Sequence, residues 1–310
     1  MKYSILIPAY KAAFFRECLE SVFSQTFQDF EVIVLNDCSP ENIDGIIAEF
    51  TDSRLRYYKN EKNVGAVDVV DNWNKLLSLA SGEFVVCMGD DDKLGNDFLA
   101  SYNMLMERYP ELDLYHARTE IINEKSQCVN IQADRPDFES VFAMLWNNIT
   151  RNRLQFIGDF LFRTSTLRAN GGFYKLPLAW ISDCVSALIA ATDKGCANLH
   201  NPTFFYRTNQ FSITSSKHIN LKIVALNRFS DWVRVFLKEN PTTGLDAKYS
   251  KLIAENIDAK VVHDVRFMLA DDLKTNWNLL FWLRNRNKYR LTFSNIFIAL
   301  VLALALKIKK

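Results

Sequence analysis

The chain has 310 residues, of which 49% are hydrophobic and 24% are charged, and its 37 lysines and arginines nearly balance 36 aspartates and glutamates. This length is sufficient for one large domain with an appendage, or for two domains, and the balanced charge gives no support to nucleic-acid binding. The six cysteines form no CxxC pair and no zinc-ligand spacing, which favours buried free thiols in a reducing cytosol. No targeting segment is recognised before the first expected strand, so we expect a cytoplasmic protein.

Short apolar runs in the first hundred residues alternate with apolar residues at helical spacing. We expect buried strands at residues 3–7, 31–35, 54–59 and 83–88. The intervening segments predict three helices, the second of which should begin with Ser39 as its N-cap and Pro40 at its first position, and the third of which should run from Gly65 to Ala80. This order is typical of a parallel sheet covered by helices.

The second half of the chain is less regular. A helix at 96–109 and a strand at 112–119 are expected, followed by loops up to about Gly158. Further elements are a strand at 160–162, a short helix stopped by Gly171-Gly172, a helix from Asp183 to Gly195 and a strand at 203–207. After about residue 217 the pattern is helical throughout. We therefore predict a domain at 1–216 and a helical C-terminal region at 217–310.

The C-terminal region ends in an apolar run at 296–306, preceded by aromatic residues and a basic cluster from Arg284 to Arg290. Even counted from Leu291 the run has fewer than the ~20 residues that a helix needs to cross a bilayer. Two interpretations remain open. One is a helix that lies in the membrane interface, and the other is a buried helix docked on the domain or on a second subunit.

Three consecutive carboxylates, Asp90, Asp91 and Asp92, follow the strand predicted at 83–88. Ligands of open α/β sheets bind outside the carboxyl ends of the strands, and a divalent cation would offset the repulsion between three like charges. The alternative is a solvated acidic turn before a helix. Because the chain has neither a GxGxxG turn nor a Walker loop, a metal ion is the remaining way to hold a pyrophosphate.

Several segments in this order resemble the family 2 glycosyltransferases with the GT-A fold, of the bacterial cell-surface polysaccharide type. The resemblance spans about residues 3–215, and its motifs are at 3–10, 19–26, 30–39, 63–65, 89–94 and 171–173, together with Asp183. It implies an α/β fold with a Rossmann-like, mostly parallel sheet flanked by helices, here with a helical C-terminal extension.

The resemblance also implies a nucleotide-sugar site. In it, Asp37 would accept a hydrogen bond from the base or the ribose, and the loop that contacts the base, with a ring available for stacking, would be Pro8, Ala9 and Tyr10. The residues that complete the pocket would be Asn63, Gly65 and Asn72, for which capping and turn formation are the alternative.

In the acidic triplet the resemblance singles out Asp91 and Asp92. They match the paired carboxylates that bind the ribose and a metal, Mn²⁺ or Mg²⁺. Gly89 stands where the family usually has a further aspartate, and we expect Asp90 only to add negative potential.

Asp183 matches the catalytic base, with Ser182 in place of the usual glutamate, and a carboxylate near the start of a helix is the structural alternative. Residues 206–214 resemble a segment that follows the base. Within that segment Arg207 could face the diphosphate, and Asn209 replaces a frequent histidine.

Together these features predict an inverting, metal-dependent enzyme that moves one sugar from a nucleotide sugar, expected to be a UDP-sugar, to a glycan or lipid-linked glycan acceptor. A peripheral position on the inner face of the cell membrane and a homo-oligomer are left open. The alternatives are a nucleotidyltransferase, which should carry a glycine-rich basic loop after the first strand, and a non-catalytic nucleotide-sugar-binding module.

Overall fold

A computed structural model describes residues 1–209 and 218–308. The chain divides into two compact units. Unit 1 comprises Met1–Lys175 and Ser182–Gln210, and unit 2 comprises Leu176–Ile181 and Phe211–Lys310. The short segment Leu176–Ile181 thus groups with the C-terminal helices. A single domain boundary near residue 216 stays a prediction.

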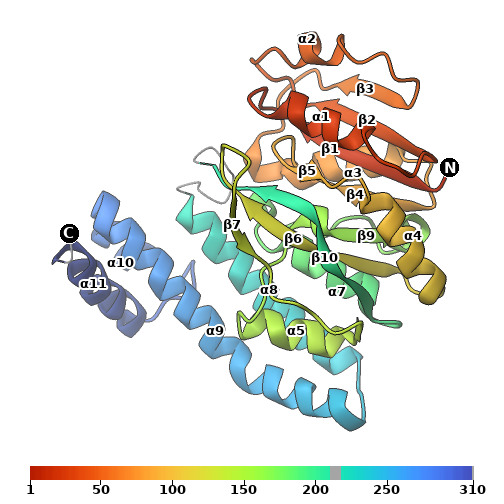
Figure 1. The fold of residues 1–310 in the computed structure, drawn as a ribbon. Helices are drawn as coiled ribbons and strands as arrows, with labels where there is room; N and C mark the ends of the chain where they lie inside the picture. The colour runs from red at the N-terminus through yellow and green to blue at the C-terminus, as the bar shows by residue number, and fades with distance from the viewer. Residues whose placement is uncertain (210–217, 309–310) are drawn as a thin grey trace. The chain divides into compact units, whose positions relative to one another are not determined.

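The first half of unit 1 alternates strands and helices as expected from the sequence (Figure 1). The strands run parallel in the order β3-β2-β1-β4. Their bounds are β1 Tyr3–Ala9, β2 Phe30–Asn36, β3 Leu55–Lys59 and β4 Phe84–Cys87, and the helices between them are α1 Phe15–Phe23, α2 Ile43–Ile47 and α3 Val69–Leu79.

The rest of the sheet is mixed. The strand order continues from β4 as β9-β6-β10-β5, where β9 is antiparallel to both of its neighbours and β6 is parallel to β10. The bounds are β5 Lys93–Leu94, β6 Leu114–Ile122, β9 Phe160–Arg163 and β10 Cys196–Arg207. The expected mostly parallel α/β sheet is confirmed, with one reversed strand at its centre.

Two expectations about local structure are wrong. Helix α2 begins at Ile43 and not after Ser39, because Asn42 is the residue whose side chain caps it by accepting from the Gly45 N–H. Residues 120–158 are not only loops: β6 continues to Ile122, and the segment then contains β7 Cys128–Ile131, β8 Phe138–Glu139 and α5 Val141–Ile149, followed by a 3₁₀ turn, η2 Ile157–Asp159.

The remaining helices of unit 1 lie close to their expected positions. They are α4 Phe98–Arg108, α6 Thr164–Ala169 and α7 Ser182–Ala191, and a 3₁₀ turn, η1 Ala66–Asp68, precedes α3. Gly171, Gly172 and Gly195 have positive φ angles of 83°, 90° and 75°, as residues that stop a helix commonly do.

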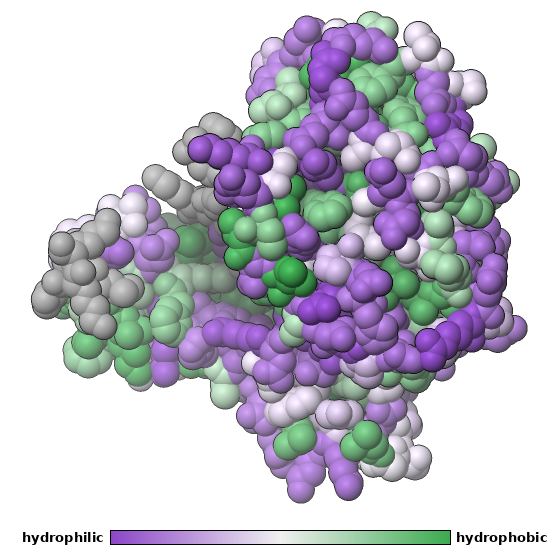
Figure 2. Space-filling model, in the orientation of Figure 1, coloured by the Kyte–Doolittle hydropathy of each residue, from purple (hydrophilic) through white to green (hydrophobic). Residues whose placement is uncertain are grey.

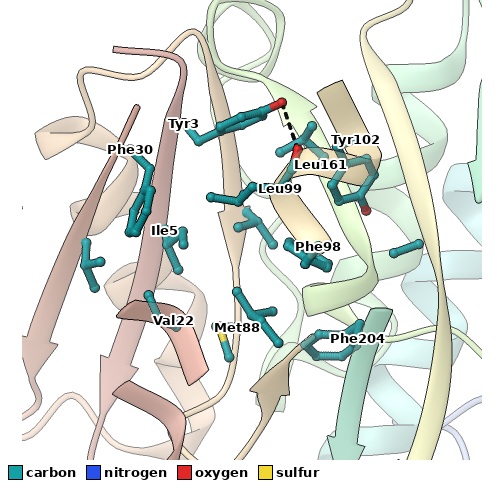
Figure 3. Close-up of a cluster of buried hydrophobic side chains, with 14 of the residues drawn as sticks. Tyr3, Ile5, Val22, Phe30, Met88, Phe98, Leu99, Tyr102, Leu161 and Phe204 are labelled. Atoms are coloured by element: carbon teal, nitrogen blue, oxygen red, sulfur yellow. Dashed lines mark hydrogen bonds between the residues drawn. The ribbon is translucent and has the colours of Figure 1, made fainter. Parts of the chain in front are cut away.

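A hydrophobic core joins the sheet to α1 and α4 (Figure 3). Tyr3 and Ile5 of β1 lie in this core with Phe98 and Leu99 of α4. The hydroxyl of Tyr3 donates to the carbonyl of Leu99 over 3.4 Å, so the polar end of this buried ring is satisfied. The packing makes a rigid platform of the strands whose carboxyl ends carry the polar residues described below.

Unit 2 is helical, as expected. It contains η3 Pro177–Ala179 and the helices α8 Ile219–Glu239, α9 Gly244–Asn276, α10 Leu279–Asn285 and α11 Phe293–Ile308. Among the residues described, no helix has the length and apolar character needed to cross a membrane.

Gly82, between α3 and β4, allows β1 to pass very closely. A Cβ atom at this position would lie 2.6 Å from both the Ser4 nitrogen and the Tyr3 carbonyl carbon, which are backbone atoms that cannot rotate away. We therefore expect Gly82→Ala to lower the free energy of unfolding by about 3 kcal/mol, as overpacking does.

The matched control is Gly171→Ala. Gly171 has a positive φ of 83° but open space around its Cα, so this change should cost only the conformational strain of about 1 kcal/mol. Urea unfolding followed by circular dichroism measures both. An equal or larger loss in the Gly171 variant would contradict the close approach at Gly82.

Candidate active site at the carboxyl ends of the strands

The loop after β1 is held by Asp90. The backbone N–H groups of Tyr10 and Lys11 both donate to Asp90 Oδ2, each over 2.7 Å, and the Asp90 side chain is buried. The Tyr10 carbonyl accepts from the Ser39 hydroxyl, and the Tyr10 side chain is 41% exposed. The loop is thus fixed through its backbone while the ring of Tyr10 remains accessible. The expectation that Asp90 only adds negative potential is corrected: it positions the loop expected to contact the base.

Asp37 directly follows β2 and gathers the neighbouring loop around its carboxylate. Asp37 Oδ1 accepts from the Val64 N–H over 2.9 Å, and Oδ2 accepts from the Gly65 N–H over 3.3 Å. The Asn63 side-chain amide donates to the Asp37 carbonyl over 3.1 Å. The Asp37 N–H donates to the Ala9 carbonyl over 2.9 Å, which links this cluster to β1.

Asn60 connects Asp37 to Asn72 on α3. Its side-chain amide donates to Asp37 Oδ1 over 2.8 Å and to Asn72 Oδ1 over 2.9 Å, while its own oxygen accepts from Lys75 Nζ over 2.7 Å. The four residues predicted here are therefore brought together, and the link from Asp37 to Asn72 is made by a residue that was not predicted from the sequence. Asn60 comes directly after β3, so a polar residue at a strand end was the available signal.

Asp91 and Asp92 turn toward Gly89. A Cβ atom on Gly89 would lie 2.8 Å from Asp91 Oδ1 and 2.9 Å from Asp92 Oδ2, so the missing side chain leaves the space in which the two carboxylates meet. Asp92 is buried, and its oxygens accept from the N–H groups of Arg207 and Gly89 over 2.9 and 3.2 Å. Asp91 Oδ2 accepts from the Asn209 amide over 2.6 Å and lies 3.5 Å from Lys11 Nζ.

Asp90, Asp91 and Asp92, which we call the acidic loop, bring like charges close together. Burial, together with the charge of Asp91, raises the pKa of Asp90 to about 6, and the same two causes raise the pKa of Asp92 well above its usual range. Within residues 1–209 and 218–308, no cluster of three or more His, Cys, Asp or Glu side chains could hold a metal. Two converging carboxylates nonetheless fit a hard cation such as Mg²⁺ or Mn²⁺, because such ions commonly take one or two carboxylates and complete their shell with substrate phosphates and water.

Arg207, at the end of β10, supports the loop of Asp91 and Asp92 through hydrogen bonds from the protein interior. Its guanidinium is fully buried, pairs with Glu17 over 2.7 Å and donates through Nε to the Asp91 carbonyl over 2.8 Å. It also donates to the Asn123 carbonyl and the Ser126 hydroxyl, each over 3.0 Å. A contact of Arg207 with a diphosphate stays a prediction. Glu17 was not predicted from the sequence, because its polar position on α1 carries no distinguishing signal.

Asp183 lies in the first turn of α7 and is half-buried. Burial is the main cause that raises its pKa to about 7, and the negative charge of Asp159 adds to the effect. A carboxyl with this pKa can exchange a proton near neutral pH. Of residues 206–214, only those up to Asn209 lie within the part of the chain that the structure describes.

The backbone just before α7 is unusual. Leu178, Ala179 and Ile181 have positive φ angles of 61°, 51° and 68°, a region that non-glycine residues, and β-branched ones above all, rarely occupy. Such conformations persist where surrounding structure enforces them, and they concentrate at functional sites. The turn that leads into the helix of Asp183 has this character.

The chain is similar to a known protein family and to individual known proteins. The model of glycosyl transferase family 2 matches residues 4–167, slightly more than half of the chain. Among curated proteins, the chain is 30% identical over 125 residues to the Escherichia coli UDP-Glc:alpha-D-GlcNAc-diphosphoundecaprenol beta-1,3-glucosyltransferase WfgD, covering 40% of this chain and 47% of that one. It is also 30% identical over 109 residues to the putative teichuronic acid biosynthesis glycosyltransferase TuaG of Bacillus subtilis, covering 34% and 42%.

Two solved structures are similar across almost the whole chain. S. aureus TarS 1-349 in complex with UDP-GlcNAc has a TM-score of 0.70 at 15% identity, covering 100% of this chain and 93% of that one. The mannosyltransferase PcManGT from Pyrobaculum calidifontis in complex with GDP-Man and Mn2+ has a TM-score of 0.53 at 14% identity, covering 98% and 87%. At these identities the likeness shows the fold, which is the expected GT-A fold.

The alignments with WfgD and TuaG cover less than half of either relative's length. The family assignment therefore depends on the family model, whose match contains the Asp37 cluster and the acidic loop. The chain therefore belongs to glycosyl transferase family 2, a family of glycosyltransferase enzymes.

Proposed function

We propose that the protein is an inverting, metal-dependent glycosyltransferase that transfers one sugar from a nucleotide sugar to a glycan or lipid-linked glycan in cell-surface polysaccharide biosynthesis. The observation that carries this proposal is the convergence of three polar groups at the carboxyl ends of β1, β2 and β4: the loop held by Asp90, the Asp37 cluster, and the Asp91–Asp92 pair. In an open α/β sheet this edge is where ligands bind.

We propose a UDP-sugar as the donor. In support, WfgD is named for UDP-Glc, and TarS was solved with UDP-GlcNAc, whereas PcManGT was solved with GDP-Man. The exposed ring of Tyr10 would stack on the base. Asp37 Oδ2, which accepts only the long 3.3 Å bond from Gly65 among the described residues, would accept a hydrogen bond from the base or the ribose.

Asp91 and Asp92 are the residues that would hold the divalent cation, since their carboxylates converge where Gly89 lacks a side chain. When bound, the cation would neutralise the charge that develops on the departing diphosphate. The buried negative charge of the loop would in turn be offset, which gives a physical reason for placing three carboxylates there.

Asp183 would act as the general base. As the acceptor oxygen forms its bond to the anomeric carbon, the acceptor hydroxyl proton passes to the Asp183 carboxylate. The bond from the anomeric carbon to the diphosphate oxygen breaks, and the nucleoside diphosphate leaves with that electron pair. Attack opposite to the leaving group inverts the anomeric configuration.

The alternatives are less well supported. A nucleotidyltransferase would be expected to belong to another family than the one matched here. A non-catalytic nucleotide-sugar-binding module would keep the donor site and not depend on Asp183.

If the acceptor is lipid-linked, the enzyme would work on the inner face of the cell membrane. Homo-oligomer formation stays open.

Donor and metal binding should raise the thermal unfolding temperature together. At a concentration of about 100 times Kd, a bound ligand stabilises a protein by about 2.7 kcal/mol. We expect a UDP-sugar with Mn²⁺ to shift the unfolding midpoint, EDTA to reverse the shift, and Asp91→Ala to remove its metal-dependent part. A panel of nucleotide sugars in a thermal-shift assay measures this. No metal-dependent shift with any donor would refute the proposed donor site.

Asp183→Asn should lower turnover by about 10²–10⁴-fold, as loss of a general base does, and leave donor binding intact. In the unchanged enzyme the rate should rise with pH through about 7, because the base works only after Asp183 loses its proton. Initial rates from pH 5 to 8.5 test both expectations, with donor binding by calorimetry as the control. Unchanged turnover in the variant would remove Asp183 from the mechanism and favour a non-catalytic role.

Asp90→Ala should weaken donor binding by about tenfold, because two charge-assisted hydrogen bonds to the Tyr10–Lys11 backbone are lost. Asp90→Asn is the matched control, since its amide oxygen can still accept from both N–H groups. Calorimetric titration with the donor compares the two variants. Equal weakening in both would show that the charge of Asp90, and not its hold on the loop, supports binding.

A further inference from the structure

Helix α11 is apolar on two sides, and the part of the chain that the structure describes covers one of them. Ile296, Ala299 and Ala303 are buried as α11 packs along α9. The spacing of the exposed apolar residues is four, four and three, which places them on one stripe of the helix. They are Phe293, Phe297, Val301 and Leu304, with exposed fractions of 63%, 66%, 49% and 44%.

The residues around α10 extend this apolar surface. Trp277, Leu280 and Phe281 are 57%, 68% and 43% exposed, and residues 277–281 line a shallow hollow. In Figure 2 green, apolar residues gather over the helices that Figure 1 labels α10 and α11. Soluble proteins rarely leave this many large apolar side chains together on the surface without a partner.

The same part of the chain carries charge of one sign. Asp272 is the last acidic residue of this sequence, and residues 273–310 hold eight of its 37 lysines and arginines. Arg284, Lys288 and Arg290 are exposed, and Arg290 pairs with Asp231 of α8 over 2.8 Å. The Arg286 guanidinium lies 4.4 Å above the ring of Phe293, which puts a basic group directly beside the apolar stripe.

We propose that this surface, which we call the C-terminal patch, binds the surface of an anionic phospholipid membrane. The patch comprises the exposed apolar residues Trp277, Leu280, Phe281, Phe293, Phe297, Val301 and Leu304, together with Arg284, Arg286 and Lys288. The aromatic and aliphatic side chains enter the interfacial region, and Arg284, Arg286 and Lys288 contact lipid phosphates. Helices of this kind lie in the plane of the interface and do not span it. The proposal goes beyond sugar transfer and does not depend on it.

A second copy of the chain is the main rival occupant. In a symmetric dimer the same patch faces itself, so two cationic segments would come together with no acidic side chain from residues 273–310 between them. An anionic lipid surface meets both requirements of the patch, since it offers an apolar layer and phosphate groups. The charge therefore selects the membrane over self-association.

The test is flotation of the full chain with vesicles of phosphatidylcholine alone and of phosphatidylcholine mixed with phosphatidylglycerol. We expect the protein to float with the anionic vesicles, to float less with the neutral ones, and to be released by salt. The double variant Phe293→Ser/Phe297→Ser should lower recovery by about tenfold, because two large apolar side chains no longer enter the interface. Arg284→Ala/Lys288→Ala should lower recovery on anionic vesicles only.

The matched control is Phe267→Ser on α9, where an equally large side chain is 51% exposed outside the C-terminal patch, and its recovery should equal that of the unchanged protein. The proposal would be overturned if the Phe293→Ser/Phe297→Ser variant and the unchanged protein were recovered equally. It would also be overturned if the unchanged protein floated with neither kind of vesicle. A dimer in light scattering that the same variant converts to a monomer would assign the patch to a second copy instead. The donor-induced thermal shift should be the same in all variants, so a failure here is distinguishable from a failure of the proposed transferase activity.

Discussion

The buried carboxylate of Asp90 is the contact on which the geometry of the site depends. It ties the end of β4 to the loop that leaves β1, two strands that are neighbours in the sheet. Because Asp90 accepts from backbone N–H groups, this contact does not use the side chains of Tyr10 or Lys11. The Tyr10 ring is left accessible, and Lys11 can reach Asp91. The loop expected to contact the base and the acidic loop are therefore directly linked.

This contact places negative charge where burial opposes it. The backbone of Arg207 supports Asp92, and its guanidinium binds the carbonyl of Asp91, but the charge of that guanidinium is already paired with Glu17. Lys11 is thus the main direct counter-charge among the described residues near Asp91. Burial is the main cause that raises the pKa values of Asp90 and Asp92, and the neighbouring charge of Asp91 adds to it. The negative charge of the acidic loop would therefore complement a divalent cation even before a substrate binds.

The sequence predicted what depends on local pattern and missed what depends on distant partners. Strands β1 to β4 lie within two residues of expectation because buried apolar runs are a direct signal. Strand β7 was missed because all its residues are exposed, and β9 runs backwards between β4 and β6 for reasons set by connections far away in the chain. In the site, the family resemblance identified Asp37 and Asn72, but the link through Asn60 and the hold of Asp90 on a backbone 80 residues away have no sequence pattern.

The near-zero net charge conceals a division of charge along the chain. Residues 273–310 carry eight cationic and no acidic side chains, which leaves 29 cationic against 36 acidic side chains in residues 1–272. A nucleotide diphosphate is an anion, so a cation at Asp91 and Asp92, as proposed, would offset its repulsion by the acidic loop. A cationic, apolar segment instead requires negative charge beside an apolar layer, and lipid phosphates above the hydrocarbon of a membrane provide both. Residues 1–272 have an excess of negative charge, and residues 273–310 have an excess of positive charge. In each part, the excess charge indicates the class of ligand that would neutralise it.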